Sequence, residues 1–324
     1  MDAASSIPLT VPPREDFRTF LNFPLADDLD RLQADIAIMG LPYGEPYSAE
    51  EVTNDQTNAP AAVRRASRRL SLGLDHWDFD IGGTLFDGKD IRVVDVGDVP
   101  MVPGDPGAHY RRAELAARKI FTAGARLISI GGDHGVPIPV FRALDTLGPV
   151  TLVHIDAHLD WRNEVNGVRE GYSSTIRRAS EMKHIRRIVQ IGMRGQGSAR
   201  AEEVQAARKW GAEIITSWEL QDRGMAAVLA AIPDGERYYL TIDADGIDPS
   251  VMPAVAAPAP GGVSYRDAIT LIKGLCRKGT LLGMDIVEIT PKADVNEMTS
   301  MAAGYFILNA IGALARSESL TRTN

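Results

Sequence analysis

The sequence predicts a three-layer α/β/α protein, in which helices cover both faces of a mostly parallel central sheet of about eight strands. Apolar runs of strand length alternate about eight times with segments of helical periodicity. The connections between them are short, as in successive βαβ units. No internal repeat or low-complexity linker divides the chain. We therefore expect one domain over residues 32–324, preceded by a proline-rich arm over residues 1–31.

The strands are expected at short apolar runs that end in glycine, proline or polar residues. The run IAIMG, at residues 36–40, shows the pattern, because it is apolar throughout and proline follows soon after its glycine. A run without polar alternation is typical of a strand buried on both faces. In chain order the expected strands are residues 36–40, 91–96, 126–130, 151–155, 187–191, 212–215, 238–242 and 281–289.

The helices are expected where apolar residues recur with helical spacing. Pro60 stands in the first turn of one of them, where its missing N–H costs nothing. Gly124 is a stop signal, and Ser217 and Ser264 are suited to be N-caps. The expected helices are residues 59–70, 110–125, 137–147, 175–183, 199–210, 217–231, 265–276 and 298–315.

The composition excludes several classes of protein. The chain has 324 residues and a net charge of -8, so it has no bulk attraction for nucleic acid or for an anionic membrane. Its single cysteine, Cys276, cannot form an intramolecular disulfide and is expected to fill the core. The N-terminus lacks the basic and apolar regions of a signal peptide, and no apolar run approaches the roughly 18–20 residues of a membrane span. The simplest expectation is a cytoplasmic protein.

The stretch LVHIDAHLD, residues 152–160, carries the strongest chemical signal. Its apolar strand runs directly into Asp156, His158 and Asp160, which stand at positions i, i+2 and i+4. In extended chain, alternate residues point to the same side. Two carboxylates and one imidazole would then converge on one point, a donor set that suits a divalent metal such as Mn²⁺.

Three further strands end in chemically similar residues. His134 follows one strand, Asp243 and Asp245 follow another, and Glu288 lies at the end of the last. Ligands of open α/β sheets bind beyond the carboxyl ends of the strands, so these residues are expected at one edge. Burying so many carboxylates without a cation would cost several kcal/mol each, which favours a metal centre. Four carboxylates and two imidazoles fit two metals about 3.5–4 Å apart better than one.

The motifs GGDH (131–134), DAHLD (156–160) and DADGIDP (243–249) resemble the three signatures of the ureohydrolases, the family of arginase, agmatinase and related amidinohydrolases. Their order and spacing agree with that family, and the resemblance covers roughly residues 36–315. It implies the arginase-like fold and two Mn²⁺ ions in each subunit. It also implies a homo-oligomer, a trimer or a hexamer.

The resemblance also implies roles for individual residues. The first Mn²⁺ would be bound by His134, Asp156, Asp160 and Asp243, and the second by Asp156, His158, Asp243 and Asp245. A hydroxide bridging the two ions would attack the guanidinium carbon, and Asp160 would orient that hydroxide. Glu288, in MDIVEITP, matches the carboxylate that pairs with the guanidinium, a geometry suited to a bidentate contact.

One position departs from the family pattern. The family carries a His-Gly pair about ten residues after its DAHxD motif, and that histidine passes a proton to the leaving amine. Here the tenth residue after Asp160 is Glu170, followed by Gly171. A glutamate could serve as the acid if burial raised its pKa. It could instead contact another substrate group, lie exposed in a loop, or mark a chain that is slow or inactive on standard substrates.

Other polar residues have two interpretations. His154 lies inside the strand and is either a satisfied core histidine, which we favour, or a partner of a metal ligand. Arg162 either binds a substrate carboxylate or pairs with Glu164 at the surface. The remaining histidines are expected at the surface: His76, His109 and His184.

These observations predict a dinuclear manganese amidinohydrolase that cleaves a small guanidino compound to urea and an amine. Agmatine is the first candidate substrate, followed by an acid such as 4-guanidinobutyrate. Ni²⁺ is an alternative to Mn²⁺, because histidine and aspartate ligands do not choose sharply between them. Two other hypotheses stay open: hydrolysis of a different C–N bond, as in formimidoyl compounds or unusual guanidines, and a non-catalytic subunit of the same fold. Neither nucleic acid nor membrane is an expected partner.

Overall fold

The structure is a computed structural model that describes residues 8–13, 18–44, 47–48, 55–101 and 105–320. In this part of the chain, eight parallel strands form one sheet in the order β2-β1-β3-β8-β7-β4-β5-β6. Their bounds are β1 Ile36–Leu41, β2 Val93–Asp98, β3 Arg126–Gly131, β4 Val150–Ile155, β5 Ile185–Met193, β6 Glu213–Thr216, β7 Arg237–Asp243 and β8 Thr280–Val287. All eight strands lie close to their predicted positions.

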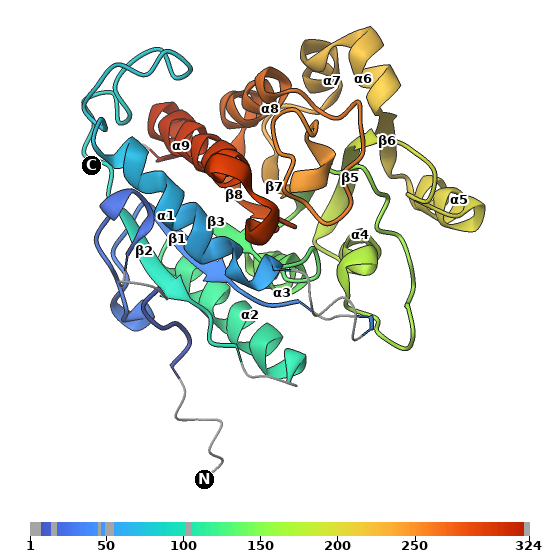
Figure 1. Cartoon of the computed structure of the whole chain (residues 1–324), viewed down its shortest axis with the longest axis horizontal. Coiled ribbons are helices and arrows are strands. Elements are labelled where there is room, and N and C mark those ends of the chain that lie inside the picture. Colours follow the sequence, from blue (N-terminus) through green and yellow to red (C-terminus); the bar gives the residue numbers. More distant parts are fainter. Residues whose placement is uncertain (1–7, 14–17, 45–46, 49–54, 102–104, 321–324) are drawn as a thin grey trace.

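Two layers of helices enclose the sheet, as Figure 1 shows. One face packs against α1 Ala59–Ser71, α6 Ser217–Arg223, α7 Met225–Ala231, α8 Tyr265–Lys278 and α9 Met298–Arg316. The other face packs against α2 Pro106–Thr122, α3 Pro137–Ala143, α4 Thr175–Ser180 and α5 Ala201–Trp210. This arrangement confirms the predicted three-layer fold.

Each central strand supplies side chains to both cores. On β1, Ile36 and Ile38 enter the core under α1 and α9, whereas Ala37 and Met39 enter the core under α2 and α3. Successive strand residues point to opposite faces, so a strand covered on both sides must be apolar throughout. The continuous apolar runs of the sequence therefore mark the strands correctly.

One predicted helix is two. The chain between residues 217 and 231 forms α6 and α7, separated by Gly224, which has a φ of 75°. That conformation ends a helix and is far easier for glycine than for other residues. The N-cap of α6 is Thr216, not Ser217. Its side chain accepts the Glu219 N–H, and the Glu219 side chain accepts the Thr216 N–H.

The N-terminal segment lies along the edge of the sheet. Val11 forms an antiparallel bridge with Asp98 of β2, and Phe20 is fully buried. The backbone N–H of Phe20 donates to Asp95, whose carboxylate also receives the buried guanidinium of Arg64 from α1. The described part of this segment is thus fastened to β2 by buried charge-assisted hydrogen bonds. The boundary expected at residue 31 stays a prediction.

Helix α9 is the core helix of the molecule. It is long and apolar enough to cross a membrane, but 83% of its most apolar window is buried inside the protein. A helix with apolar residues all around its circumference needs such cover. Cys276 of α8 is also buried, as predicted, and burial raises the pKa of its thiol to about 12.

The prediction that His109 lies at the surface is wrong. His109 belongs to α2 and is fully buried, and its ring stacks on Tyr43 with 5.1 Å between the centroids. Burial lowers its pKa to about 4. Of the other two histidines, His76 is exposed as predicted, whereas His184 is partly buried and contacts the carbonyl of Phe141 at 2.8 Å.

Candidate metal centre

Four neighbouring strands bring the predicted ligands together. The central order β3-β8-β7-β4 places the ends of these strands side by side at the carboxyl edge of the sheet. His134 follows β3, Glu288 follows β8, Asp243 ends β7, and the segment 156–160 follows β4. Residues separated by up to 154 positions in sequence therefore surround one point, where open α/β sheets bind their ligands.

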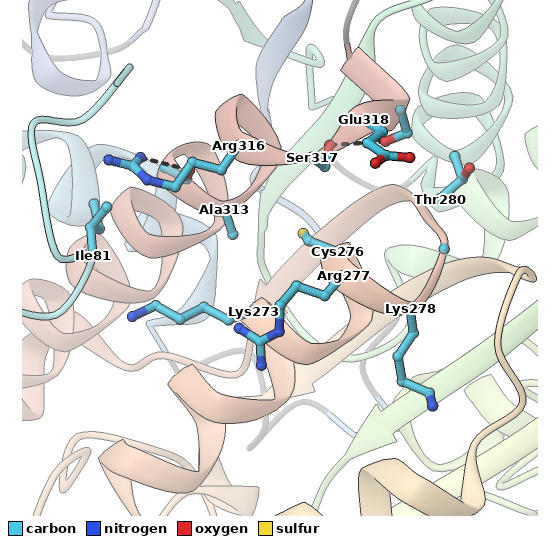
Figure 2. Close-up of a pocket in the computed structure, with 13 residues that line it drawn as sticks. Ile81, Lys273, Cys276, Arg277, Lys278, Thr280, Ala313, Arg316, Ser317 and Glu318 are labelled. Carbon is cyan, nitrogen blue, oxygen red and sulfur yellow. Dashed lines mark hydrogen bonds between the residues drawn. The ribbon is translucent and has the colours of Figure 1, made fainter. Parts of the chain in front are cut away.

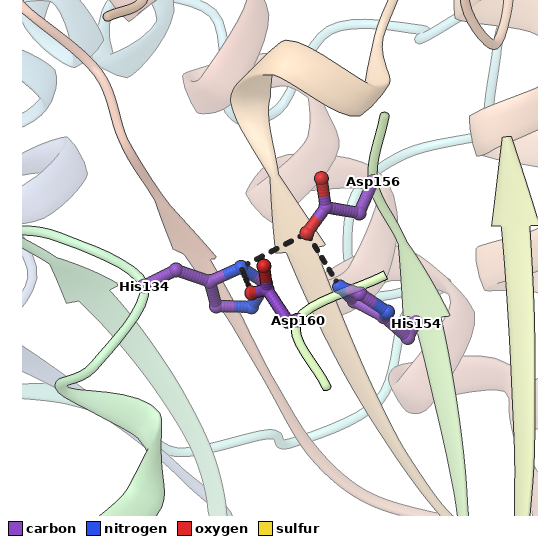
Figure 3. Close-up of side chains that lie close together, drawn as sticks. All are labelled: His134, His154, Asp156 and Asp160. Carbon is purple, nitrogen blue, oxygen red and sulfur yellow. Dashed lines mark hydrogen bonds and ion pairs between the residues drawn. The ribbon is translucent and has the colours of Figure 1, made fainter. Parts of the chain in front are cut away.

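His134 is the centre of the first half of the cluster. Its Nδ1 atom lies 3.2 Å from Asp156 Oδ2, 3.1 Å from Asp160 Oδ2 and 3.1 Å from Asp243 Oδ2. Figure 3 shows the first two of these contacts. Despite these short distances, neither His134 Nδ1 nor Asp160 Oδ2 has a hydrogen-bond partner among the described residues. Four electron-rich atoms thus converge with no hydrogen bond joining His134 Nδ1 to any of the carboxylates.

A buried hydrogen-bond chain explains why His134 Nδ1 carries a lone pair. The Thr241 hydroxyl donates to Asp285 Oδ1 at 2.6 Å, so its oxygen is free to accept from His134 Nε2 at 3.0 Å. A neutral imidazole carries one N–H proton, so a proton on Nε2 leaves Nδ1 unprotonated. The hydroxyl and carboxylate behind His134 thereby fix the tautomer that can bind a metal.

Asp156 connects the two halves of the cluster. Its Oδ2 faces His134, while its Oδ1 lies 3.3 Å from Nδ1 of His158. The predicted core histidine, His154, contacts the same carboxylate, with 2.8 Å between Nε2 and Asp156 Oδ2. Gln190 of β5 holds the other nitrogen of His154 at 3.2 Å. His154 is therefore a satisfied core residue and also a partner of a predicted ligand.

The second half of the cluster consists of Asp156, His158 and Asp245. Nδ1 of His158 lies 3.2 Å from Asp245 Oδ2. The first group, comprising His134, His154, Asp156 and Asp160, and this second group each bring their ligand atoms close enough to hold one ion, and they share Asp156. The geometry therefore offers two adjoining positions with one carboxylate between them.

Burial and neighbouring charges shift the pKa values of the carboxyls in the cluster in different directions. Burial, followed by the charge of Asp156, raises the pKa of Asp160 to about 7. Burial and the charges of Asp245 and Asp156 hold the pKa of Asp243 well above its ordinary range. Burial opposes the ionisation of Asp156 too, but the three histidines around it hold the pKa of this carboxyl well below its usual range.

The residues fit a divalent cation. Four carboxylates and two imidazoles form a hard-to-borderline donor set, and the buried, unpartnered Nδ1 of His134 and Oδ2 of Asp160 point at the same place. A cation there would compensate a cost of several kcal/mol for each buried carboxylate. Two ligand-site residues also have strained backbones, because Asp160 and Glu288 have φ values of 52° and 64°.

A cavity of about 340 Å³ opens above the cluster. Glu288 lies in its wall and is held by two donors: the backbone N–H of His134 at 2.8 Å to Oε1, and Gln56 Nε2 at 2.9 Å to Oε2. Burial raises its pKa. Besides ligands and these residues, the cavity is lined by Trp161, Arg162, Tyr172, Ser173, Gly197, Ser198, Glu203, Ala256 and Ala257.

Arg162 and Glu170, which the sequence singled out, lie outside the cluster of predicted ligands. Arg162 lines the cavity, and its Nε lies 3.7 Å from Glu203 Oε1, so neither interpretation foresaw its partner. Glu170 is not among the described residues that line the cavity. Its carboxylate forms an ion pair with Arg142 of α3, and its carbonyl accepts the Tyr110 hydroxyl at 2.9 Å.

A second cavity, of about 810 Å³, lies between α8 and α9 and is shown in Figure 2. It contains several cations, but Lys278 is paired with Asp234 and Arg316 donates to backbone carbonyls of Thr84, Leu85 and Gly312. Cys276 there is a protonated thiol at neutral pH because of its raised pKa. In the described part of the chain, the groups of histidines and aspartates that could hold a metal ion lie below the first cavity and not here, so that cluster is the candidate site.

Sequence reasoning did not identify four residues that hold the cluster in place: Gln56, Gln190, Thr241 and Asp285. Thr241 and Asp285 are polar residues inside apolar strands, with no exposed surface. A buried polar residue in a central strand needs a partner, and that rule was the available signal. The partner itself lies on another strand and cannot be read from spacing.

The chain was compared with known proteins. Residues 34–312 match the Arginase family model. An agmatinase of Citrobacter koseri is 31% identical over 300 residues, which cover 90% of this chain and 91% of that protein. The structure of a hypothetical agmatinase from Burkholderia thailandensis matches with a TM-score of 0.77 and 26% identity, covering 92% of this chain and 90% of the other.

Proclavaminate amidino hydrolase from Streptomyces clavuligerus has a similar structure, with a TM-score of 0.78 and 25% identity over 95% of this chain and 100% of the other. Each comparison spans nearly the whole chain, and the family match includes the complete cluster of His134, Asp156, Asp160 and Asp243. The chain therefore belongs to the arginase family and is a ureohydrolase, an enzyme that hydrolyses linear amidines.

Proposed function

We propose that this ureohydrolase uses two Mn²⁺ ions to hydrolyse a small guanidino compound to urea and an amine, with agmatine as the first candidate. The observation that carries the two-metal proposal is the orientation of Asp156. Its two oxygens face two different histidine nitrogens, 3.2 Å from His134 and 3.3 Å from His158. A carboxylate shared in this way suits a pair of cations better than a single one.

The proposed ligands divide into two sets. His134, Asp156, Asp160 and Asp243 would hold one ion, and Asp156, His158, Asp243 and Asp245 the other. When bound, such a pair lowers the pKa of water to near neutrality and stabilises negative charge that develops on the substrate. Ni²⁺ would be accepted by the same donors, since nitrogen and oxygen ligands do not discriminate sharply between the two metals.

The protein's own groups would bind and orient the substrate. Glu288 would accept the guanidinium N–H groups, because its carboxylate is already fixed by His134 N–H and Gln56 and has remaining lone pairs toward the cavity. Asp160 would bind one ion through Oδ2, the oxygen without a hydrogen-bond partner among the described residues, and would orient the attacking water by a hydrogen bond.

Arg162 favours a second candidate substrate class, the guanidino acids. It is a cation in the cavity wall, its ion pair with Glu203 is long at 3.7 Å, and its side chain makes no hydrogen bond within the described part of the chain. A carboxylate at the far end of the substrate could therefore pair with it. The variant Arg162→Met would then lower activity on 4-guanidinobutyrate and leave agmatine hydrolysis unchanged.

The test is a urea-release screen over guanidino compounds with Mn²⁺ and with Ni²⁺, combined with the metal content of the protein by mass spectrometry. The proposal expects two metals per chain and urea from at least one linear guanidino compound. Formamide or ammonia as the released product would replace it with hydrolysis of another C–N bond. Fewer than about one metal per chain at saturating Mn²⁺ would overturn it.

Two further properties are proposed from the family resemblance. We expect a homo-oligomer, a trimer or a hexamer, and a cytoplasmic location without nucleic-acid or membrane partners. Light scattering after size-exclusion chromatography tests the first, because a monomeric mass would contradict it. Fractionation of the source cells tests the second.

A further inference from the structure

One wall of the cavity is formed by the segment 170–175, which we call the wall segment. Tyr172 and Ser173 of this segment line the cavity directly. Residues Tyr172–Ser174 form a short 3-10 helix that leads into α4. The wall segment is therefore a connection between elements, and no strand of the sheet holds it in place.

Contacts on its first side fasten the wall segment to α2 and α3. The Glu170 carboxylate pairs with the Arg142 guanidinium of α3, and the Glu170 carbonyl accepts the Tyr110 hydroxyl of α2 at 2.9 Å. Helix α3 begins at Pro137, only three residues after the predicted ligand His134. The ion pair therefore joins the wall segment to α3, the helix that begins just after the predicted ligand His134.

Contacts on its second side involve Tyr47. The Tyr47 hydroxyl accepts the Ser173 N–H at 2.8 Å, and the Tyr47 ring lies 4.3 Å from that of Tyr172. A Cβ atom at Gly171 would lie 2.5 Å from the Tyr47 ring, so the close approach requires glycine. At the end of the segment, the Thr175 hydroxyl donates to the carbonyl of His134.

These contacts indicate that Glu170 holds the wall segment in position. Its carboxylate is directed to Arg142 and is not among the described groups that line the cavity, so it is not placed to act on a substrate there. The residues that follow it do line the cavity, and their positions depend on where Glu170 is fixed. A residue of this kind affects the shape of the cavity more than the chemical step.

We propose that Glu170 is a positioning residue, which together with Arg142 fastens the wall segment over the metal cluster and thereby sets the affinity for substrate. Both side chains of the pair are one-third exposed, so the pair is worth the modest amount typical of solvent-accessible ion pairs. A two- to fivefold change is the expected scale for breaking it. Only the activity measurements below depend on the proposed guanidino hydrolysis.

The experiment compares Glu170→Gln, Arg142→Gln and the charge-swapped double variant, in which Glu170→Arg is combined with Arg142→Glu. All are measured in the full metal-loaded protein. The matched control is Glu181→Gln, which breaks the ion pairs of Glu181 with Arg177 and Arg178 at the end of α4. Amide hydrogen exchange of residues 171–175 reports the fastening directly. Steady-state kinetics over a pH series separates KM from kcat.

Both single variants should accelerate hydrogen exchange in the wall segment and raise KM about two- to fivefold, with kcat and its pH dependence unchanged. The charge-swapped variant should recover slow exchange, and the control should behave as wild type. Unchanged exchange in both single variants would overturn the proposal. So would a kcat that falls more than about tenfold in Glu170→Gln alone with loss of one limb of the pH profile, since that identifies a proton donor.

The two proposals fail in distinguishable ways. If no guanidino compound yields urea, the proposed function fails, while hydrogen exchange still decides whether Glu170 and Arg142 fasten the wall segment. If urea is released and exchange is unaffected by the variants, the positioning role alone fails.

Discussion

The floor and the wall of the cavity are built in different ways. The floor is the cluster of predicted ligands, which stand at the ends of buried strands whose backbones are hydrogen-bonded on both sides. The wall segment, residues 170–175, is held by a partly exposed ion pair, one tyrosine hydroxyl at each side, ring contacts and two hydrogen bonds, one from the Thr175 hydroxyl to His134 and one from the Arg162 N–H to the Ser173 carbonyl. Rigid strand ends can hold several charges at fixed distances, whereas a loop can change partners at small cost.

This difference between floor and wall bears on the one position that departs from the expected family pattern. The floor keeps all six expected ligands. Glu170, which stands where the resemblance led us to expect a histidine, lies in the wall segment. We expect a change in the wall segment to alter which substrates fit, and a change in the floor to remove the activity. The predictions below test this division, beginning with the floor.

The largest effect is expected from Asp156→Asn. This carboxylate faces both His134 and His158, so its loss affects both metal positions. Outer partners of ligands typically change affinity by 10–100-fold, so loss of a shared ligand should cost more than about 100-fold in Mn²⁺ affinity and in kcat/KM. Calorimetric Mn²⁺ titration and urea release measure the two. An equivalent change at Asp248, whose carboxylate accepts the backbone N–H groups of Ser250, Gly261 and Gly262, is the control.

Glu288→Gln should give the next largest effect. It replaces a charge-assisted contact with the guanidinium by a neutral one, a loss of about 1.5–3 kcal/mol, which corresponds to roughly 10–100-fold in kcat/KM. The metal content should stay at the wild-type value, because Glu288 is not a predicted ligand and both of its carboxylate oxygens accept hydrogen bonds from the protein. A variant that loses its metals would show that Glu288 supports the floor.

Thr241→Val should weaken metal binding by about 10–100-fold, since it removes the acceptor that fixes the tautomer of His134. Thr241→Ser keeps the hydroxyl and should restore the affinity. The wall segment should keep wild-type hydrogen exchange in both variants. If valine and serine weaken binding equally, the effect comes from packing and not from the hydrogen bond to His134.

The smallest effect at neutral pH is expected from His109, which lies beside Tyr110, the residue whose hydroxyl donates to the Glu170 carbonyl of the wall segment. Its pKa is about 4 in the folded protein and 6.5 in the unfolded chain, so the unfolded state binds the extra proton between these values. The effect of His109 on the free energy of unfolding is therefore constant above pH 6.5. As the pH drops from 6.5 to 4, protonation of His109 in the unfolded chain lowers the free energy of unfolding by ~3 kcal/mol at most.

Urea unfolding at pH 7 and at pH 4.5 measures this change, with His109→Gln as the comparison. The variant should lose less stability between the two pH values than the wild type. Equal losses in the two proteins would assign the acid sensitivity to the carboxylates of the floor. Exposed His76 provides a second comparison, because its substitution should leave the pH dependence unchanged.

The sequence by itself determined the layers and the strands, and it predicted the residues that lie together in the cluster. Apolar runs such as residues 36–41 must be buried on both faces, and the clustered motifs around Asp156 and Asp243 are chemically improbable without a cation. Local spacing also located the departure at Glu170. These properties depend on neighbouring residues, and the sequence shows neighbours directly.

The tertiary structure alone decided which residues support those sites. The order β3-β8-β7-β4 placed Thr241 behind His134 and Asp285 behind Thr241, and it buried His109 in a helix that sequence reasoning had left at the surface. It also paired Glu170 with Arg142, a residue 28 positions earlier. Such partners are set by the packing of distant elements, which depends on the total burial of the chain and leaves no local pattern in the sequence.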